Sequence, residues 1–358
     1  MAKNNNLTDF LTDIANAIRT KKGTTAKINP QNFSSEIASI STGGGDTPTP
    51  DTPTPDMPVI GDGKTYLYIK IAEKGRMTVP LYFTQTVANG VAIDWGDGSA
   101  TETLSGTGKL NTTHTYADVG EYTISLNPSS GCTLGLGHNL PDYCVMGSTT
   151  NAGKVYCNML QAVEIGKSVT SIGSYAFNYC YSLASIVIPS GVTSIDSSTF
   201  AYCYSLASVV IPEGVTSIGS NAFSDCQSLA SVVIPEGVTS IGNYAFNGCY
   251  SLASVVIPDS VTSIGGNAFQ NCYSLASVVI PSGATSIGSY AFRNCYGMAY
   301  YDFRASKSVP TLSNTNAFGS IPSDCKIVVP DSLYDTWIAA TNWSTHASKI
   351  IKTSEFNG

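Results

Sequence analysis

A 23-residue unit repeats six times in the middle of this 358-residue chain. Its consensus is Ser-Ile-Gly-x-x-Ala-Phe-x-x-Cys-x-Ser-Leu-Ala-Ser-Val-Val-Ile-Pro-x-Gly-Val-Thr, and the copies begin at residues 171, 194, 217, 240, 263 and 286. A unit this short cannot bury its hydrophobic face alone, so successive copies must stack on one another. The repeat therefore predicts a solenoid whose coils share one continuous core.

The pattern inside one copy indicates a strand followed by a returning segment. In the third copy, Leu229, Val232 and Ile234 are expected to point inward, and Ser231 and Val233 outward. The proline after Ile234 ends the strand. Each strand would pair in parallel with the same strand of the next coil, which makes the predicted fold class mainly β.

Degenerate copies flank the regular ones. One precedes them around Cys157, Leu160, Val163 and Ile165, and another follows around Phe318 and the run Lys326–Pro330. Weakened end copies are typical of solenoids, because a terminal coil faces water on one side.

The segment from Pro330 to Trp343 has the pattern of an amphipathic helix. Its apolar residues Leu333, Trp337 and Ile338 are spaced to cover the open end of the last coil. We therefore expect a C-terminal capping helix.

Composition divides the chain into five segments. The first has apolar residues at helical spacing from Leu7 to Ile18 and a glycine stop at Gly23, and the second holds five of the seventeen prolines. We assign residues 1–42 to an N-terminal helical docking or oligomerisation unit, 43–58 to a Pro/Thr/Gly-rich linker, 59–128 to a small β-sandwich, 129–300 to the solenoid with its degenerate first copy, and 301–358 to the degenerate last copy and capping helix.

The cysteines follow the repeat. Seven of the ten recur every 23 residues, at positions 157, 180, 203, 226, 249, 272 and 295. A small apolar thiol at one place in every coil fills an interior slot, and stacked parallel neighbours rarely reach disulfide geometry. The spacing favours a buried, reduced column over a disulfide ladder. Cys132, Cys144 and Cys325 lie outside this spacing.

The segment Ile93-Asp94-Trp95-Gly96-Asp97-Gly98-Ser99, followed by His114-Thr115-Tyr116, resembles polycystic-kidney-disease-type (PKD) domains, which implies a PKD-like β-sandwich over about seventy residues. Asp94 and Asp97 raise the question of a calcium site. A tight turn, in which each Asp caps its own backbone, is the simpler interpretation and the one we favour. We predict no metal site.

The repeat itself, with its Ala-Phe-x-x-Cys and Ile-Pro elements, resembles BspA-like leucine-rich repeats over roughly 150 residues. Leucine-rich-repeat folds in general imply binding rather than chemistry. The segment 330–343 is similar to the closing segment of repeat proteins carried by phages of Gram-positive gut bacteria. Residues 11–33 are likewise similar to a small module that opens phage structural proteins.

Composition narrows the possible functions. The net charge of −7 provides no basic patch for nucleic acid, and no apolar run is long enough to enter a membrane. The three histidines are far apart in the sequence, and no Gly-x-Ser-x-Gly, P-loop, dinucleotide or Cys-x-x-Cys motif is present. We expect neither an enzyme nor a cofactor, nucleic-acid partner or membrane insertion. Residues 1–19 show no secretion signal.

The residue after each repeat cysteine is nearly always tyrosine. These positions, which we call the tyrosine column, are our candidate ligand-binding residues Tyr181, Tyr204, Gln227, Tyr250, Tyr273 and Tyr296. Tyrosine combines an apolar face with a polar tip, so the column could stack sugars or a protein edge. The rings could instead stack on each other and shield the coil edges.

Other repeat positions are further candidates for a binding surface. The copies differ mainly at the two residues after Ser-Ile-Gly and the two before Cys, for example Ser174 and Tyr175 or Asn178 and Tyr179. Two outward ladders accompany the column, Ser185, Ser208, Ser231, Ser254 and Ser277 beside Val187, Val210, Val233, Val256 and Val279. The valines could form a protein-binding patch or an ordinary sheet face.

Together these features predict a non-enzymatic adhesion protein. Our first hypothesis is a phage virion protein, associated with the tail or fibre and assembled in the bacterial cytoplasm, whose solenoid binds a bacterial surface protein or glycan. Its N-terminus would contact other virion proteins or form a homo-oligomer. The alternative is a bacterial cell-surface or secreted adhesin that binds a host protein or glycan.

Overall fold

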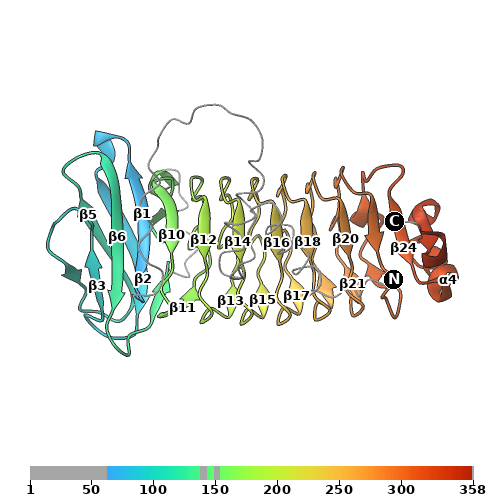
Figure 1. The fold of residues 1–358 in the computed structure, drawn as a ribbon, viewed down its shortest axis with the longest axis horizontal. Coiled ribbons are helices and arrows are strands. Elements are labelled where there is room, and N and C mark those ends of the chain that lie inside the picture. Colours follow the sequence, from blue (N-terminus) through green and yellow to red (C-terminus); the bar gives the residue numbers. More distant parts are fainter. Residues whose placement is uncertain (1–62, 138–142, 149–153, 357–358) are drawn as a thin grey trace, which may run out of the picture. The chain divides into compact units, whose positions relative to one another are not determined.

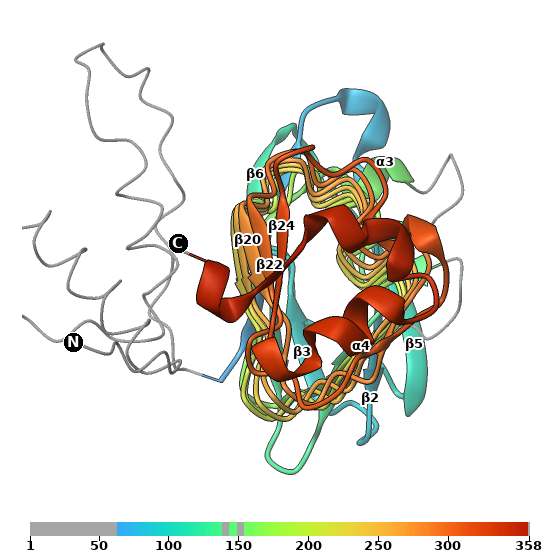
Figure 2. The same cartoon turned by 90° about the vertical axis from the view of Figure 1, so that its right-hand side faces the viewer.

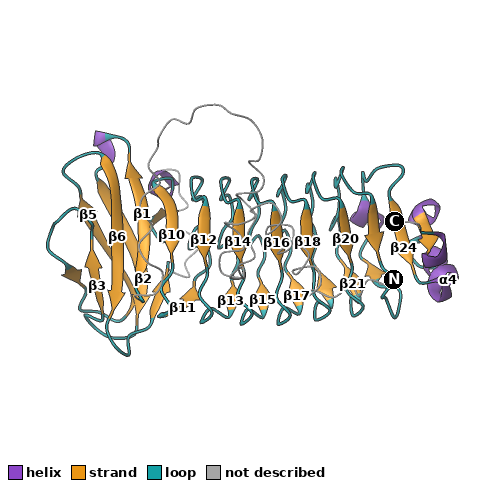
Figure 3. Ribbon diagram, in the orientation of Figure 1, coloured by secondary structure: helices purple, strands orange, loops and turns teal. Residues whose placement is uncertain are grey.

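The computed structural model describes residues 63–137, 143–148 and 154–356. The predicted helical unit 1–42 and the linker 43–58 lie outside the described residues. The described part contains a β-sandwich, a solenoid of stacked coils and a C-terminal cap, and its helices are few and short (Figure 3). The predicted fold class, a mainly β solenoid of 23-residue repeats, is confirmed.

Two sheets form the sandwich. One contains β1 (Thr65–Ile71), β6 (Gly120–Pro128), β3 (Val91–Asp94) and β4 (Glu102–Thr103); the other contains β5 (Gly108–Thr115), β2 (Thr78–Gln85) and β7 (Leu134–Leu136). A 3₁₀ turn, Lys74–Arg76, joins β1 to β2. Alternation explains the packing, since Leu67, Ile69 and Ile71 on β1 are all buried.

The sandwich and the solenoid share their sheets. β1 pairs antiparallel with β10 (Leu160–Glu164), with Leu67 opposite Val163, and so joins the sandwich sheet to the first solenoid strand. On the other side, β7 pairs with β2 and also, in parallel, with β11 (Val169–Ile172). The first coil therefore has no open sheet edge at its N-terminal end (Figure 1).

The solenoid coils stack in register, with two strands per coil (Figure 1). The longer strands are β12 (Ser185–Val187), β14 (Ser208–Val210), β16 (Ser231–Val233), β18 (Ser254–Val256), β20 (Ser277–Val279), β22 (Tyr300–Asp302) and β24 (Lys326–Val329). The shorter ones are β13 (Ser194–Ile195), β15 (Ser217–Ile218), β17 (Ser240–Ile241), β19 (Ser263–Ile264), β21 (Ser286–Ile287) and β23 (Thr311–Leu312). Equivalent residues face each other, as Ser231 does Ser254. Viewed along the stack, the coils superimpose (Figure 2).

The interior follows the predicted pattern. Leu229, Val232 and Ile234 are buried, whereas Ser231 and Val233 are partly exposed. The repeat phenylalanines form a buried ladder in which consecutive rings are stacked, 5.4 Å apart for Phe177 and Phe200 and 5.3 Å for Phe223 and Phe246. The seven rings of this ladder are Phe177, Phe200, Phe223, Phe246, Phe269, Phe292 and Phe318. Each coil is thus held by its neighbours more than by its own contacts.

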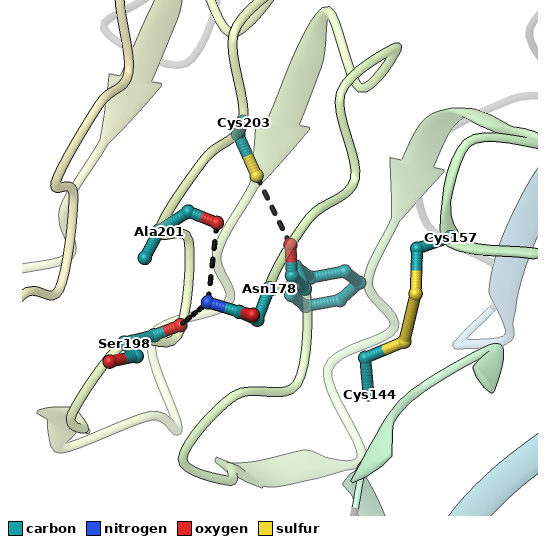
Figure 4. Close-up of a disulfide and its surroundings, with 7 residues drawn as sticks. Cys144, Cys157, Asn178, Ser198, Ala201 and Cys203 are labelled. Carbon is teal, nitrogen blue, oxygen red and sulfur yellow. Dashed lines mark hydrogen bonds between the residues drawn. A yellow bond between two sulfur atoms is a disulfide. The ribbon is translucent and has the colours of Figure 1, made fainter. Parts of the chain in front are cut away.

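The cysteine column is buried and reduced in the six full copies, as predicted. Each thiol from Cys203 onward donates to the backbone carbonyl of the phenylalanine one coil earlier, for example Cys203 Sγ to Phe177 at 3.2 Å (Figure 4). Burial raises the pKa of these thiols, to about 12 for Cys295, so they remain protonated at neutral pH.

The prediction is wrong for Cys157, which forms a disulfide with Cys144 (Figure 4). Cys157 ends the short helix α3 (Lys154–Cys157), and Cys144 lies on the small hairpin β8 (Tyr143–Cys144) and β9 (Gly147–Ser148) that packs against it. The first coil has no preceding repeat, so a residue from this hairpin occupies the position next to the Cys157 thiol.

The C-terminal cap closes the far end of the stack (Figure 2). It consists of short helical turns at Thr315–Phe318, Asp331–Leu333, Ser344–Lys349 and Thr353–Glu355, the helix α4 (Tyr334–Ala339), and β25 (Ile350–Lys352), which pairs in parallel with β24. Trp337 is buried as predicted, and Leu333 and Ile338 are partly buried. The helix is shorter than the predicted 330–343, because the chain turns to extended backbone at Ala340 and buries Trp343 as well.

Candidate functional site

Five rings of the tyrosine column form two stacks. Tyr181 and Tyr204 are parallel with centroids 4.7 Å apart, Tyr250 and Tyr273 are 4.9 Å apart, and Tyr273 and Tyr296 are 5.3 Å apart. The coil spacing sets these distances, because equivalent residues of adjacent coils lie about 4.8 Å apart in a parallel sheet. Gln227 occupies the coil between the two stacks.

Stacking determines which part of each ring meets solvent. Tyr273 has a ring on each face and is still 39% exposed, so its accessible surface is the ring edge and the hydroxyl. Burial raises the pKa of Tyr181 and of Tyr204, which keeps their hydroxyls protonated and able to donate. A flat ligand can therefore lie against a ring face only where a stack ends.

A second pair of tyrosines extends the first stack sideways. Tyr179 and Tyr202 stack at 4.7 Å, and their rings contact Tyr181 and Tyr204 edge to face, at 5.8 and 6.3 Å. We call these four side chains the tyrosine quartet. The repeat pattern marks Tyr179 only as a variable position, although the tyrosine before the cysteine in both of the first two copies is a sequence signal for this contact.

Two backbone positions in every full copy have positive φ. They precede Ala-Phe (or Thr-Phe) and Cys, and their φ values lie between 55° and 72°; the residues are Tyr175, Ser198, Asn221, Tyr244, Asn267 and Tyr290, then Tyr179, Tyr202, Asp225, Gly248, Asn271 and Asn294. This conformation lets alternate N–H groups donate to the next coil, as Phe223 does to Ala245 O at 2.7 Å. Gly, Asn and Asp adopt it easily, whereas tyrosine does so at a cost of about 1 kcal/mol or more. The positive φ thus limits which residues these positions can hold at low energetic cost.

Asp225 lies in the coil that interrupts the tyrosine column. It is partly buried, and Ser224 Oγ donates to its Oδ2 at 3.1 Å. Burial raises the pKa of its carboxyl, against the hydrogen bond from Ser224, which lowers it. Its Oδ1 lies over Gly248, where any Cβ would come within 2.6 Å of that oxygen. The carboxylate is therefore directed toward the next coil.

The outward valines and serines form the flat face of the longer-strand sheet. Val187, Val210 and Val279 are 43%, 39% and 57% exposed, and Val233 and Val256 are partly buried. Between residues 171 and 296 the sequence has only six charged side chains, so this face is nearly uncharged. It can bury apolar area against a partner but cannot steer one electrostatically.

A shallow groove of about 550 Å³ crosses the shorter-strand sheet. Apart from Ile241 and Ile264, its lining is small or polar, with glycines at 242, 265 and 288 and serines at 220, 263 and 286. The glycines allow close coil packing, since a Cβ on Gly265 would come within 2.6 Å of Gly242 backbone. No aromatic or charged side chain lines it.

In the sandwich, Asp94 and Asp97 cap turns. Asp94 Oδ1 accepts from Gly96 N at 2.9 Å and Asp97 Oδ1 accepts from Ser99 N at 3.0 Å, while Asp97 Oδ2 lies 2.7 Å from His114 Nε2. The indole of Trp95 stacks on the His114 ring at 4.8 Å. The carboxylates therefore hold the Trp-Gly-Asp-Gly turn together, in the arrangement that the sequence favoured over a calcium site.

Over the described ranges, no three His, Cys, Asp or Glu side chains come together as a metal site would require. In the same residues, no helix has the length and apolar character to cross a bilayer.

Comparison with known proteins identifies the repeats. The family model for the BspA type leucine rich repeat region matches six copies, over residues 154–252 and 193–325. No curated protein matches the chain.

Several solved structures are similar to part of the chain. A leucine-rich repeat protein from Bacteroides ovatus is 33% identical over 49% of this chain and 45% of its own, with a TM-score of 0.44. The T. pallidum leucine rich repeat protein is 30% identical over 49% of this chain and 81% of its own, with a TM-score of 0.39. A leucine rich cell surface protein from Faecalibacterium prausnitzii is 27% identical over 57% of this chain and 65% of its own, with a TM-score of 0.34.

This chain thus spans less than half of the Bacteroides ovatus protein. With the family model matching from residue 154 to residue 325, the repeat region of this chain belongs to the BspA-type leucine-rich repeat family.

Proposed function

We propose that this protein is a non-enzymatic adhesion protein whose solenoid binds a bacterial surface. The observation that carries the proposal is the solenoid surface itself, which presents serines and valines in successive coils, and tyrosine hydroxyls at five of the six column positions, on a rigid frame. Stacked repeats form extended surfaces suited to binding. The near absence of charge leaves hydrogen bonds and apolar contact as the means of recognition.

The first setting for this function is a phage virion. It rests on the similarity of residues 11–33 and 330–343 to segments of phage proteins, and on the proline-rich linker, which would act as a semi-rigid spacer. The sandwich, PKD-like in its Trp-Gly-Asp-Gly turn, would carry the solenoid. Several copies on one particle would compensate for weak single contacts through avidity.

The second setting is a bacterial cell surface or secreted adhesin. The disulfide between Cys144 and Cys157 favours it, because such bonds persist mainly in oxidising compartments outside the cytoplasm.

The test is binding of the purified full-length protein to intact Gram-positive gut bacteria, measured by flow cytometry. We expect saturable binding that weakens in a double variant, Tyr204→Ala and Tyr250→Ala. The matched control is Tyr66→Ala, on the sandwich strand β1, which should bind like the wild type. A protein that binds no strain would contradict the proposal.

The setting is tested separately with an antibody against the solenoid. Labelling of purified phage particles supports the virion, and labelling of intact bacterial cell walls supports the adhesin.

A further inference from the structure

The coil that carries Asp225 and Gln227 differs from its neighbours in two ways at once. It places glutamine in the tyrosine column and the only carboxylate among the residues that precede the repeat cysteines. Both changes occur where the two tyrosine stacks end, so the coil separates the face of Tyr204 from the face of Tyr250.

We propose that this coil forms a slot that binds one pyranose ring of a bacterial surface glycan, between the ring faces of Tyr204 and Tyr250. Asp225 and Gln227 hydrogen-bond the hydroxyls of the sugar. The inference rests on the proposed function, and it names the ligand class of the solenoid and the residues that recognise it.

The dimensions of the slot fit a single ring. Tyr204 and Tyr250 are two coils apart, which separates their rings by roughly 10 Å. A group midway lies about 5 Å from each, close to the 4.7–5.3 Å at which the tyrosines stack on one another. A pyranose can therefore take the place that a phenol ring takes in other coils, once the flexible Gln227 side chain turns outward.

The polar groups at the slot suit a sugar. Asp225 precedes Gln227 by two residues, and its Oδ1 lies over Gly248, two residues before Tyr250. Burial, and after it the negative charge of Asp225, raise the pKa of Tyr204 and of Tyr250. A carboxylate accepts strong hydrogen bonds from hydroxyls, and the Gln227 amide can donate and accept. The Asp225 side chain is itself positioned, because its Oδ2 accepts a hydrogen bond from Ser224 and its Oδ1 packs over Gly248, which has no Cβ.

A sugar fits this combination better than a protein segment does. A pyranose presents an apolar C–H face for an aromatic ring and a rim of hydroxyls for polar groups. An extended peptide would instead need a groove along several coils or an unpaired strand edge. The slot is only one coil wide. Its coil contains β16, which pairs with β14 on one side and β18 on the other, so no unpaired strand edge is available there.

The test uses saturation-transfer NMR of the full-length protein with methyl glycosides of glucose, galactose, mannose and N-acetylglucosamine. We expect at least one glycoside to bind. The variant Gln227→Tyr should abolish this binding, because it completes the stack, and it should not lower the melting temperature. The variant Asp225→Asn keeps the size and backbone preference of the residue and should weaken binding about tenfold or more. The control Asp259→Asn removes an exposed carboxylate outside the slot and should bind like the wild type.

The outcomes separate the inference from the proposed function. Binding of a glycoside that survives Gln227→Tyr overturns the slot. Binding of bacteria without binding of any glycoside also overturns it and indicates a protein receptor, while the adhesion function stands. Glycoside binding lost in Gln227→Tyr supports the slot even if no tested bacterium is bound.

Discussion

The Sγ of Cys226 lies 3.2 Å from the carbonyl oxygen of Phe200, one coil earlier, and the same contact recurs from Cys203 to Cys295. Every one of these thiols is buried, and burial raises its pKa. Thiolate, the reactive form, is therefore scarce at neutral pH.

We expect the six column cysteines to be inert to Ellman's reagent in the native protein and to react once it is unfolded. The rate in dilute urea would then report opening of the coils. In a variant that keeps Cys226 and has the other five column cysteines replaced by alanine, rapid reaction of Cys226 with Ellman's reagent would contradict this burial.

The disulfide makes a countable prediction. The protein unfolded in guanidinium without a reductant should contain eight free thiols, and ten after reduction, because Cys144 and Cys157 are the bonded pair. Peptide mass spectrometry should find the linked pair. The double variant Cys144→Ser and Cys157→Ser should lose about 2–3 kcal/mol of unfolding free energy, as expected for closing a loop of this length. Ten thiols without reductant would refute the bond.

The phenylalanine ladder should dominate the stability of the stack. We expect Phe246→Ala to lower the unfolding free energy by about 3–5 kcal/mol, since it removes a fully buried ring that stacks on both neighbours. The matched control, Val279→Ala, changes a side chain that is 57% exposed and should cost about 0.5 kcal/mol or less. Urea denaturation compares the two, and equal losses would argue against a core organised around this ladder.

The backbone positions with positive φ predict a substitution that raises the unfolding free energy. Tyr244 has a φ of 59° and is 43% exposed, and the equivalent residue in both adjacent coils is asparagine. Tyr244→Asn should raise the unfolding free energy by about 0.5–1 kcal/mol, because asparagine adopts this backbone more easily. The reverse change one coil earlier, Asn221→Tyr, should lower it by a similar amount. Thermal unfolding measures both variants, and shifts of the same sign would count against the backbone explanation.

The sandwich turn predicts a dependence on acid. Hydrogen bonds from Ser99 and His114 lower the pKa of Asp97 from 3.8 to about 2. A carboxyl whose pKa falls on folding stabilises the folded state above pH 3.8 and loses that contribution as the pH falls toward 2. We expect Asp97→Asn to flatten the fall in unfolding free energy between pH 4 and 2. An unchanged slope in the variant would show that this carboxyl does not contribute.

The sequence predicted the interior of the solenoid because a 23-residue period repeats the same local choice many times. Leu229, Val232 and Ile234 could be placed inward because the same apolar pattern recurs in the neighbouring copies, and all three are buried. It could not predict the pairing of Leu67 with Val163, since these residues lie far apart in the chain and no periodic pattern links them. The strand Ile350–Lys352 could not be predicted for the same reason, because it lies within the cap and does not belong to the repeat.

For the candidate site, the spacing placed Tyr181 and Tyr204 in one column but did not show which part of each ring faces solvent. That depends on side-chain torsions, which a repeat pattern does not specify. The partnership of Asp225 with Gly248 likewise depends on the left-handed backbone at both residues, which the tyrosines at equivalent positions concealed.

The placement of β1 also has a mechanical consequence. The strand lies between β6 and β10, with seven residue pairs on one side and four on the other. A pull on the chain ahead of Thr65, directed along the strand, would load these backbone hydrogen bonds together in shear rather than break them one at a time. An adhesion protein held by its N-terminal side would in this way transmit tension into the sheet that the sandwich and the solenoid have in common.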